Sequence, residues 1–290
     1  MLEISNKDVV LQIRDDLGAA ISRYDFVDGH AIFRPAPGDS KLPFEMACNL
    51  LVPWCNRISD GGFFCNDTFY PLAPNIEGDE SPLHGDAFLK AWTCIATSDT
   101  SLTLELVSKN LGPFEYRAEV IYTLQGKDLT IDLSVTNLST LELPYGLGLH
   151  PWFKQDEDTE IQASIQHVIT SNEHNLPESK VVVSDKPELD FRTSNKLPVT
   201  GLDNCFTGWD QRAVLTWPSR NMSVVVDAGK NFTECHIYSK NRQGSFFCFE
   251  PVTHPVNAHN WPDQSLKGLT LLREGETITT HCRFSPEINE

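Results

Sequence analysis

The chain has 290 residues, of which 40% are hydrophobic and 22% are charged, and its formal net charge at pH 7 is −17. The composition is that of an ordinary globular protein. The negative charge argues against binding to nucleic acid or to an anionic membrane surface, because both require clustered lysine and arginine. The first residues, MLEISNKDVVLQIRDD, contain no basic region followed by an apolar run, and no stretch approaches 18 apolar residues. We therefore expect a cytoplasmic protein.

Strand patterns begin near the N-terminus and recur about every 8–12 residues, with turn residues between them. Within residues 129–135 apolar and polar side chains alternate strictly, which is typical of a sheet with one face in water. In chain order, the expected strands are residues 9–14, 19–24, 44–52, 63–65, 68–72, 91–97, 101–108, 117–124, 128–136, 161–169, 181–183, 213–217, 222–227, 234–239, 245–250 and 277–284.

The chain shows no capped helical stretch of useful length, no change in composition that would mark a domain boundary, and no repeat. Residues 172–197 are polar, and we expect them to form a long surface excursion. The eight cysteines, at positions 48, 55, 65, 94, 205, 235, 248 and 282, include no C-x-x-C pair, and we expect reduced, buried thiols. The pattern predicts an all-β protein, one large antiparallel β-sandwich over residues 1–290.

Residues 145–153, Tyr-Gly-Leu-Gly-Leu-His-Pro-Trp-Phe, contain the first candidate for chemistry. The glycines leave room for a ligand or another backbone, and Pro151 cannot donate to a sheet, so we expect the strand to stop there with His150 at its rim. Trp152 would add an aromatic wall suited to a sugar. The plainer interpretation is that His150 is a strand-end histidine bonded to a carbonyl.

Residues 245–254, Ser-Phe-Phe-Cys-Phe-Glu-Pro-Val-Thr-His, contain an unusual carboxylate. Glu250 follows an apolar run and precedes Pro251, so we expect it to end a buried strand. A charge there is costly unless it is paired or functional. Residues 255–260 could form a loop that closes over the site.

Four further polar residues are candidates for binding. Asn56 and Arg57 follow an apolar run, and the arginine offers forked donors to hydroxyls or to a carboxylate. His84 lies beside a glycine in a loop, and Asp203 follows a Pro/Gly-containing loop. On these patterns alone, Arg57 could equally be a surface arginine paired with an acid, and His84 and Asp203 could be turn residues.

Taken together, these motifs resemble those of the aldose 1-epimerase (galactose mutarotase) family. The resemblance covers roughly residues 45 to 260, with all motifs in family order. They are Asn56-Arg57-Ile58, Leu83-His84-Gly85, Gly148-Leu149-His150-Pro151-Trp152-Phe153, Leu202-Asp203-x-x-Phe206 and Glu250-Pro-x-Thr-His254-Pro-x-Asn257-Ala258. The family fold is a large antiparallel β-sandwich with a sugar cleft across one face.

The resemblance implies a role for each matching residue. His150 matches the general acid and Glu250 the general base, and His84 matches a second histidine of the sugar site. The positions that hold sugar hydroxyls are matched by Asn56, Arg57 and Asp203. Trp152 stands where tyrosine is common, and His259 stands where many relatives have phenylalanine, which suggests an extra polar contact at the rim, near His254.

The implied reaction is the exchange of α and β anomers of a free hexose, with Glu250 taking the C1 hydroxyl proton and His150 supplying one to the ring oxygen. Such a reaction requires no metal or organic cofactor, and the expected partner is a small aldose, bound by a monomer or homodimer. Four alternatives remain open. They are a hexose-6-phosphate mutarotase, a non-catalytic sugar-binding protein, a glycosidase using Asp203 and Glu250, and a metal site of His84, His150 and Glu250.

Overall fold

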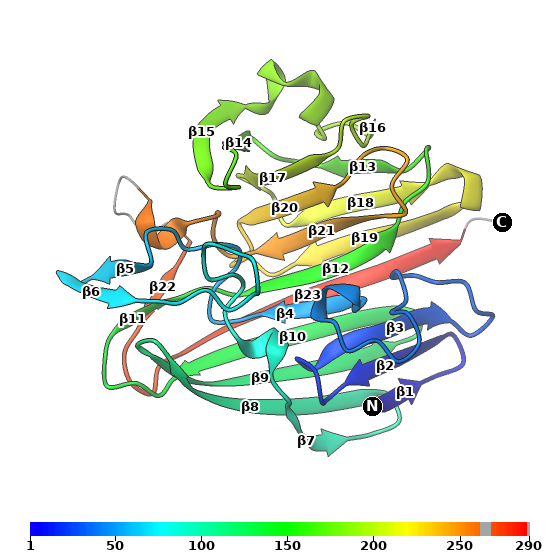
Figure 1. The fold of residues 1–290 in the computed structure, drawn as a ribbon. Coiled ribbons are helices and arrows are strands. Elements are labelled where there is room, and N and C mark those ends of the chain that lie inside the picture. Colours follow the sequence, from blue (N-terminus) through cyan, green and yellow to red (C-terminus); the bar gives the residue numbers. More distant parts are fainter. Residues whose placement is uncertain (262–267, 289–290) are drawn as a thin grey trace.

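The computed structural model describes residues 1–261 and 268–288, and β-strands dominate these ranges. The strands form one ten-stranded sheet, one nine-stranded sheet and two small two-stranded sheets (Figure 1). Neighbouring strands pair antiparallel in both large sheets. The helical segments of the described chain are short 3₁₀ turns. The predicted all-β fold with large antiparallel sheets is therefore confirmed.

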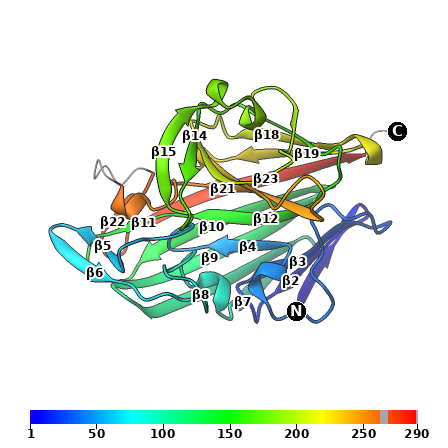
Figure 2. The same ribbon diagram turned by 45° about the horizontal axis from the view of Figure 1, so that its top comes forward.

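The ten-stranded sheet contains, in spatial order, β1 (Leu2–Ser5), β2 (Val9–Arg14), β3 (Ala20–Phe26), β4 (Cys48–Leu51), β12 (Gly148–Lys154), β21 (Phe246–Val252), β20 (Glu234–Ser239), β17 (Leu202–Thr207), β14 (His167–Ser171) and β15 (Pro177–Val182). In Figure 2, β14 and β15 stand at one edge of this sheet.

The nine-stranded sheet contains, in spatial order, β16 (Asn195–Lys196), β13 (Glu160–Ala163), β18 (Arg212–Trp217), β19 (Met222–Ala228), β23 (Thr277–Ile288), β10 (Asp128–Asn137), β9 (Phe114–Gln125), β8 (Ser101–Leu111) and β7 (Thr93–Thr97). The small sheets pair β11 (Leu143–Tyr145) with β22 (Thr270–Leu272) and β5 (Gly62–Cys65) with β6 (Thr68–Pro71). The 3₁₀ turns are η1 (Pro43–Glu45), η2 (Ala87–Leu89), η3 (Val183–Asp185), η4 (Pro187–Leu189), η5 (Pro218–Arg220) and η6 (Ala258–Asn260).

The hydrophobic core lies between the two large sheets. Phe153 of β12 and Phe247 of β21 each lie 6.0 Å, between ring centroids, from Trp217 of β18. Side chains alternate between the two faces of a strand. Because Phe153 and Phe247 point into the core, His150 and Glu250 project from the opposite face of the ten-stranded sheet. This alternation places the acid/base candidates outside the core, on one surface.

The structure corrects the expected ends of the two strands that carry His150 and Glu250. β12 continues through Pro151 to Lys154, and β21 continues through Pro251 to Val252. The candidates therefore lie inside strands in the middle of the sheet and not at strand ends.

The two prolines interrupt the pairing between these strands instead. β12 and β21 pair on both sides of residues 149–151 but not across them. The N–H of Trp152 donates to Ala47 on the β4 side, so an N–H at residue 151 would point toward β21, and proline has none. The same register places His150 opposite Glu250, at the point where the ladder is open.

Three other expectations about the strands were wrong. Residues 44–52 form the turn η1 followed by the short strand β4. Residues 161–169 form parts of β13 and β14, which belong to different sheets. Residues 172–197 are not only a surface excursion, because they contain β15 and β16 and bury Phe191 in the core. The polar composition of residues 172–197 gave no indication of the short strands β15 and β16.

All eight cysteines are free, and all are buried except Cys94, which is half-buried. This agrees with the expected reduced thiols. In the described part of the chain, none of the helices has the length and apolar character needed to cross a membrane.

Candidate active site

A cavity of about 350 Å³ lies on the outer face of the ten-stranded sheet, over β12, β17, β20 and β21. The structure brings together in it all seven residues that the sequence predicted for the site: Asn56, Arg57, His84, His150, Trp152, Asp203 and Glu250. The cavity is also lined by residues that sequence reasoning missed, namely Phe44, Asp79, Leu83, His236, Tyr238 and Phe246. Its volume exceeds that of a single hexose, so one sugar ring fits with its hydration.

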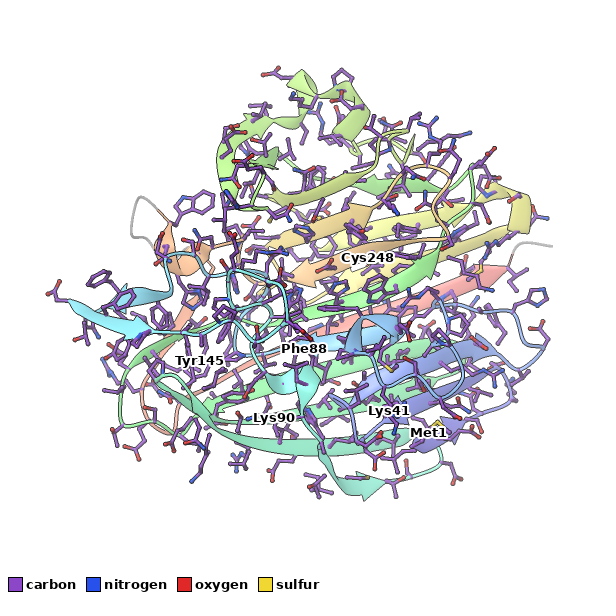
Figure 3. The ribbon with its side chains drawn as sticks, viewed as in Figure 1. Met1, Lys41, Phe88, Lys90, Tyr145 and Cys248 are labelled. Carbon is purple, nitrogen blue, oxygen red and sulfur yellow. The ribbon has the colours of Figure 1, made fainter. Side chains whose placement is uncertain are left out.

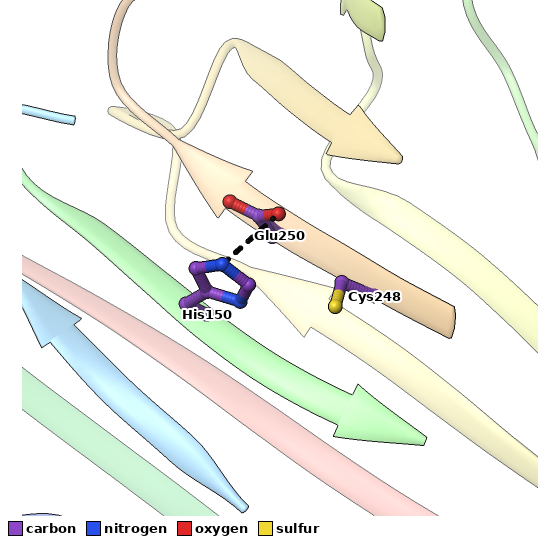
Figure 4. Close-up of side chains that lie close together, drawn as sticks. All are labelled: His150, Cys248 and Glu250. Carbon is purple, nitrogen blue, oxygen red and sulfur yellow. Dashed lines mark ion pairs between the residues drawn. The ribbon is translucent and has the colours of Figure 1, made fainter. Parts of the chain in front are cut away.

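His150 and Glu250 face each other across the open ladder. The Nε2 atom of His150 lies 3.5 Å from the Oε1 atom of Glu250 (Figure 4). The two side chains are only 6% and 3% exposed, so both groups are held away from bulk water. An acid and a base so close together can exchange a proton directly or through a ligand placed between them.

Burial holds His150 in its neutral form. Burial, together with the charge of His236, lowers the pKa of His150 to about 3. The imidazole stacks almost parallel on the indole of Trp152, with 4.9 Å between ring centroids. The Nδ1 atom of His150 is buried and has no hydrogen-bond partner in the described structure. Trp152 thus fixes the plane of the ring whose Nε2 atom faces Glu250.

His236 is the most informative residue that sequence reasoning missed. It lies on β20 directly beside Glu250 in the sheet register, and its Nε2 atom lies 2.6 Å from Oδ1 of Asp203. Burial lowers the pKa of His236, but the hydrogen bond to Asp203 and the charge of Glu250 outweigh it, so the pKa is raised overall. Burial raises the pKa of Asp203, but the hydrogen bond from His236 and the charges of His236 and Arg57 together lower it overall. Both shifts favour the charged forms, an imidazolium and a carboxylate.

The environment of Glu250 is set by burial and by two neighbouring charged groups. Phe249, the preceding residue, lies in the core on the other face. Burial raises the pKa of Glu250, the charge of His236 opposes this rise and the charge of Asp203 adds to it, so that the pKa is about 8. The compensating positive charge thus comes from His236. At pH 7 these shifts favour the shared proton of the His150–Glu250 pair on Glu250.

Asn56 and His84 hold each other in place on two facing loops. The backbone N–H of Asn56 donates to Nδ1 of His84 at 2.9 Å, and the backbone N–H of His84 donates to the carbonyl of Asn56 at 3.0 Å. His84 is therefore a neutral histidine with its hydrogen on Nε2, and burial, with the charges of His150 and Arg57, holds its pKa well below the usual value. Its ring lies 5.4 Å from that of His150.

The loop that carries His84 is fixed by Asn75. The amide of Asn75 donates to the carbonyls of Leu83 and Gly85 and accepts from the N–H of Leu83. Gly85 has a φ of +67°, and a Cβ atom there would lie 2.0 Å from the carbonyl oxygen of Val52. Only glycine permits this approach, so the glycine beside His84 is a packing requirement of the site.

Arg57 lies at the wall of the cavity, half-buried. Its Nη2 atom is 3.5 Å from Oδ1 of Asp79, and its backbone N–H donates to the side chain of Asn56. Both interpretations of this arginine therefore apply, because it is paired with an acid and also lines the cavity.

The loop at residues 255–260 does not close over the site. Asn257 accepts the N–H of Ser59 and donates back to its hydroxyl, and Asn260 donates to the carbonyls of Ser59 and Gly62. These bonds fasten the loop to the segment that follows Arg57. The loop thus supports the cavity wall in this structure and does not cover the cavity.

His254 and His259 are supports as well, and neither lines the cavity. Nε2 of His254 accepts the N–H of Cys55, which fixes the backbone just before Asn56. His259 packs against Phe63, with 4.9 Å between ring centroids, and its Nε2 atom lies 3.3 Å from the carbonyl oxygen of Pro144, so its polar contact is with the backbone and not with the cavity. A phenylalanine would suit the same apolar surroundings.

We expect His259→Phe to protect the protein against acid. Burial lowers the pKa of His259 to about 3, and the charge of His254 contributes. Because the pKa is lower in the folded than in the unfolded protein, the unfolded chain binds the proton at a higher pH than the folded protein does. The stability that the neutral His259 contributes is therefore fully present above pH 6.5 and is lost as the pH falls toward 3. As the pH is lowered from 7.5 to 5, the free energy of unfolding of the variant should rise by about 2 kcal/mol relative to that of the wild-type protein. Urea unfolding at both values measures this, with the exposed His30→Gln as control.

Comparison with known proteins places the fold in the galactose mutarotase-like class. A crystal structure of a galactose mutarotase-like protein from Clostridium acetobutylicum superposes with a TM-score of 0.88 at 20% identity, covering 99% of this chain and 95% of that one. A crystal structure of a candidate aldose 1-epimerase from Escherichia coli K12 gives a TM-score of 0.93 at 29% identity, covering 99% and 98%.

The sequence relationships are more specific. The family model for aldose 1-epimerase matches residues 2–285. YphB, an uncharacterised protein of Escherichia coli K12, is 30% identical over 290 residues, which cover 98% of each chain. The chain therefore belongs to the aldose 1-epimerase family, whose members act on sugars.

Proposed function

We propose that this protein interconverts the α and β anomers of a free hexose by acid/base-catalysed ring opening and closure. The observation that supports this most strongly is the His150–Glu250 pair, 3.5 Å apart, in a sugar-sized cavity flanked by an imidazolium–carboxylate pair. Mere binding has no need of an acid and a base held together at the floor of the cavity.

In the proposed reaction, the ionised Glu250 takes the proton of the C1 hydroxyl while the protonated His150 gives one to the ring oxygen. The bond between C1 and the ring oxygen breaks as the C1 carbonyl forms, and rotation about the C1–C2 bond turns the other carbonyl face toward the hydroxyl. Ring closure then reverses both proton transfers. The pair holds one proton throughout, on His150 before opening and on Glu250 in the open-chain intermediate.

Burial favours a neutral Glu250 and a neutral His150, which is the proton arrangement of the open-chain intermediate. Bound hydroxyls must therefore help to stabilise the ionised pair. The hydroxyl donors of a sugar and the imidazolium of His236 would both stabilise a carboxylate at Glu250. Asp203 holds that imidazolium in place, so we assign it a binding and positioning role.

A phosphorylated hexose is the less favoured substrate. Of the described residues that line the cavity, the one lysine or arginine is Arg57, and its guanidinium is already shared with Asp79. Phosphate recognition generally uses several such donors. The glycosidase alternative is also weakened, since Asp203 is bonded to His236 and is not free to act on a glycosidic oxygen.

Arg57→Ala should weaken sugar binding and leave the proton transfers largely intact. The guanidinium lies at the wall, away from the His150–Glu250 pair, so its hydroxyl contacts would be equal in the ground and transition states. We expect KM to rise about tenfold with kcat changed less than threefold. Steady-state kinetics measure both constants, and an unchanged KM would remove the binding role.

Polarimetry on freshly dissolved α-glucose, α-galactose and a hexose 6-phosphate tests the proposed function. Faster rotation change with a free hexose than in buffer supports it. Acceleration only with the phosphate would make the protein a phosphosugar mutarotase. No acceleration with any of them, together with measurable sugar binding, would make it a non-catalytic sugar-binding protein.

A further inference from the structure

Cys248 places a third metal-binding group next to the acid/base pair. It lies on β21 two positions before Glu250, on the same face of the strand, near the middle of the ten-stranded sheet (Figure 3). One ligand atom each from His150, Cys248 and Glu250 lie within 4.8 Å of one another, and all three side chains are buried (Figure 4). The alternative metal site of His84, His150 and Glu250 is less favoured, because Nδ1 of His84 accepts a backbone N–H.

The ligand set is chemically that of zinc. Zn²⁺ takes imidazole nitrogen, thiolate sulfur and carboxylate oxygen, whereas Mg²⁺ prefers oxygen ligands in an octahedron. One nitrogen of His150 faces Glu250 and the other, Nδ1, is buried without a hydrogen-bond partner in the described structure. A metal ion would satisfy an imidazole nitrogen that the empty protein leaves in a region closed to water.

The charge balance also favours a divalent, thiophilic ion. A thiolate and a carboxylate together carry two negative charges, so a complex with Zn²⁺ and a neutral imidazole has no net charge. Burial and the charge of Glu250 raise the pKa of the Cys248 thiol, and the charge of Arg34 opposes that rise. A bound cation would displace the thiol proton and remove the cost of burying separate charges.

We propose that Zn²⁺ binds to His150, Cys248 and Glu250, with water as the fourth ligand, and thereby blocks the sugar site. The metal occupies the two groups that must exchange protons, so the bound state is inhibited. The inhibition rests on the proposed function, whereas the binding does not.

Calorimetric titration of the full chain with Zn²⁺ tests the binding. We expect one Zn²⁺ per chain, with affinity lowered at least tenfold in Cys248→Ser and unchanged in Cys235→Ser. Cys235 is a matched control because it is also buried and free but lies in the core on the other face. Equal affinity in the wild-type protein and Cys248→Ser would overturn the proposal.

Cd²⁺ gives a second test that requires no variant. A thiolate ligand produces a charge-transfer absorption with Cd²⁺ in the ultraviolet, and we expect it with one equivalent of metal bound to the wild-type protein. Absence of that band at saturation would exclude Cys248 as a ligand, even if Cys248→Ser did not fold.

Mutarotation assays then separate this inference from the proposed function. Zn²⁺ should inhibit the wild-type protein, EDTA should restore the rate, and Mg²⁺ should have no effect. Cys248→Ser should keep the wild-type basal rate and need at least tenfold more Zn²⁺ for the same inhibition. Zinc binding that depends on Cys248 in a protein with no mutarotase activity would reject the proposed function alone. Activity that tightly bound Zn²⁺ leaves unchanged would reject the inhibitory role.

Discussion

Glu250→Gln is expected to lower kcat for mutarotation about 10²–10⁴-fold, the usual contribution of a positioned acid or base. Glutamine keeps the shape of the side chain but can neither take nor give the proton. The neighbouring His236 and Asp203 remain, so the sugar should still bind with a dissociation constant within about threefold of the wild-type value. Polarimetry measures the rate, and calorimetric titration with the sugar measures binding.

The matched control is Glu178→Gln, an exposed carboxylate on β15 away from the cavity, which should leave both constants unchanged. His150→Gln should resemble Glu250→Gln, since each removes one half of the same transfer. The double variant should then lose little more than either single one, because the groups act as a unit. Retained turnover in Glu250→Gln would remove the acid/base assignment.

The value of kcat/KM for mutarotation should also fall about tenfold per pH unit above a pH of about 8. The His150–Glu250 pair must hold one proton, and with His150 neutral that proton is on Glu250, whose pKa burial raises to about 8. Below this value the pair keeps its proton, and above it the proton is lost and both transfers stop. The pH dependence of kcat/KM reports groups of the free enzyme, so it is the quantity to measure.

His236→Gln should shift the fall in kcat/KM at alkaline pH to higher pH. The imidazolium of His236 lowers the pKa of Glu250, whereas the charge of Asp203 raises it. Removing His236 takes away the first effect and leaves the second without compensation, so Glu250 holds its proton more strongly. If kcat/KM of this variant falls at the same pH as that of the wild-type protein, Glu250 is not the group that titrates.

The strand periodicity was sufficient to predict the fold class, because apolar and polar residues alternate along strands such as β10. The ends of β12 and β21 were not predictable from proline alone. A proline stops pairing on one side of a strand only, and Pro151 keeps its place because its missing N–H points toward the open part of the ladder. Local sequence does not show which side of a strand a neighbour occupies.

Some residues of the site could likewise be predicted from the sequence, and others could not. The motif residues His150 and Glu250 were recognisable because each is a polar group in an apolar run beside a proline. His236 lies in the run Glu-Cys-His-Ile-Tyr-Ser, which also alternates, so a polar residue facing the outer surface gave no signal of its own. Its importance comes from the sheet order, which places β20 between β17 and β21 and brings Asp203 and Glu250 to its two sides. That order depends on pairing between strands that are far apart in the sequence.

The most direct measurement is magnetisation exchange between the α and β anomeric protons of an equilibrated free hexose, observed by NMR with the purified protein. Exchange faster than in buffer for the wild-type protein, and at the buffer rate for Glu250→Gln, is the expected result. Absence of accelerated exchange with every free hexose that binds in the cavity would contradict proton transfer between the sugar and the pair formed by residues 150 and 250.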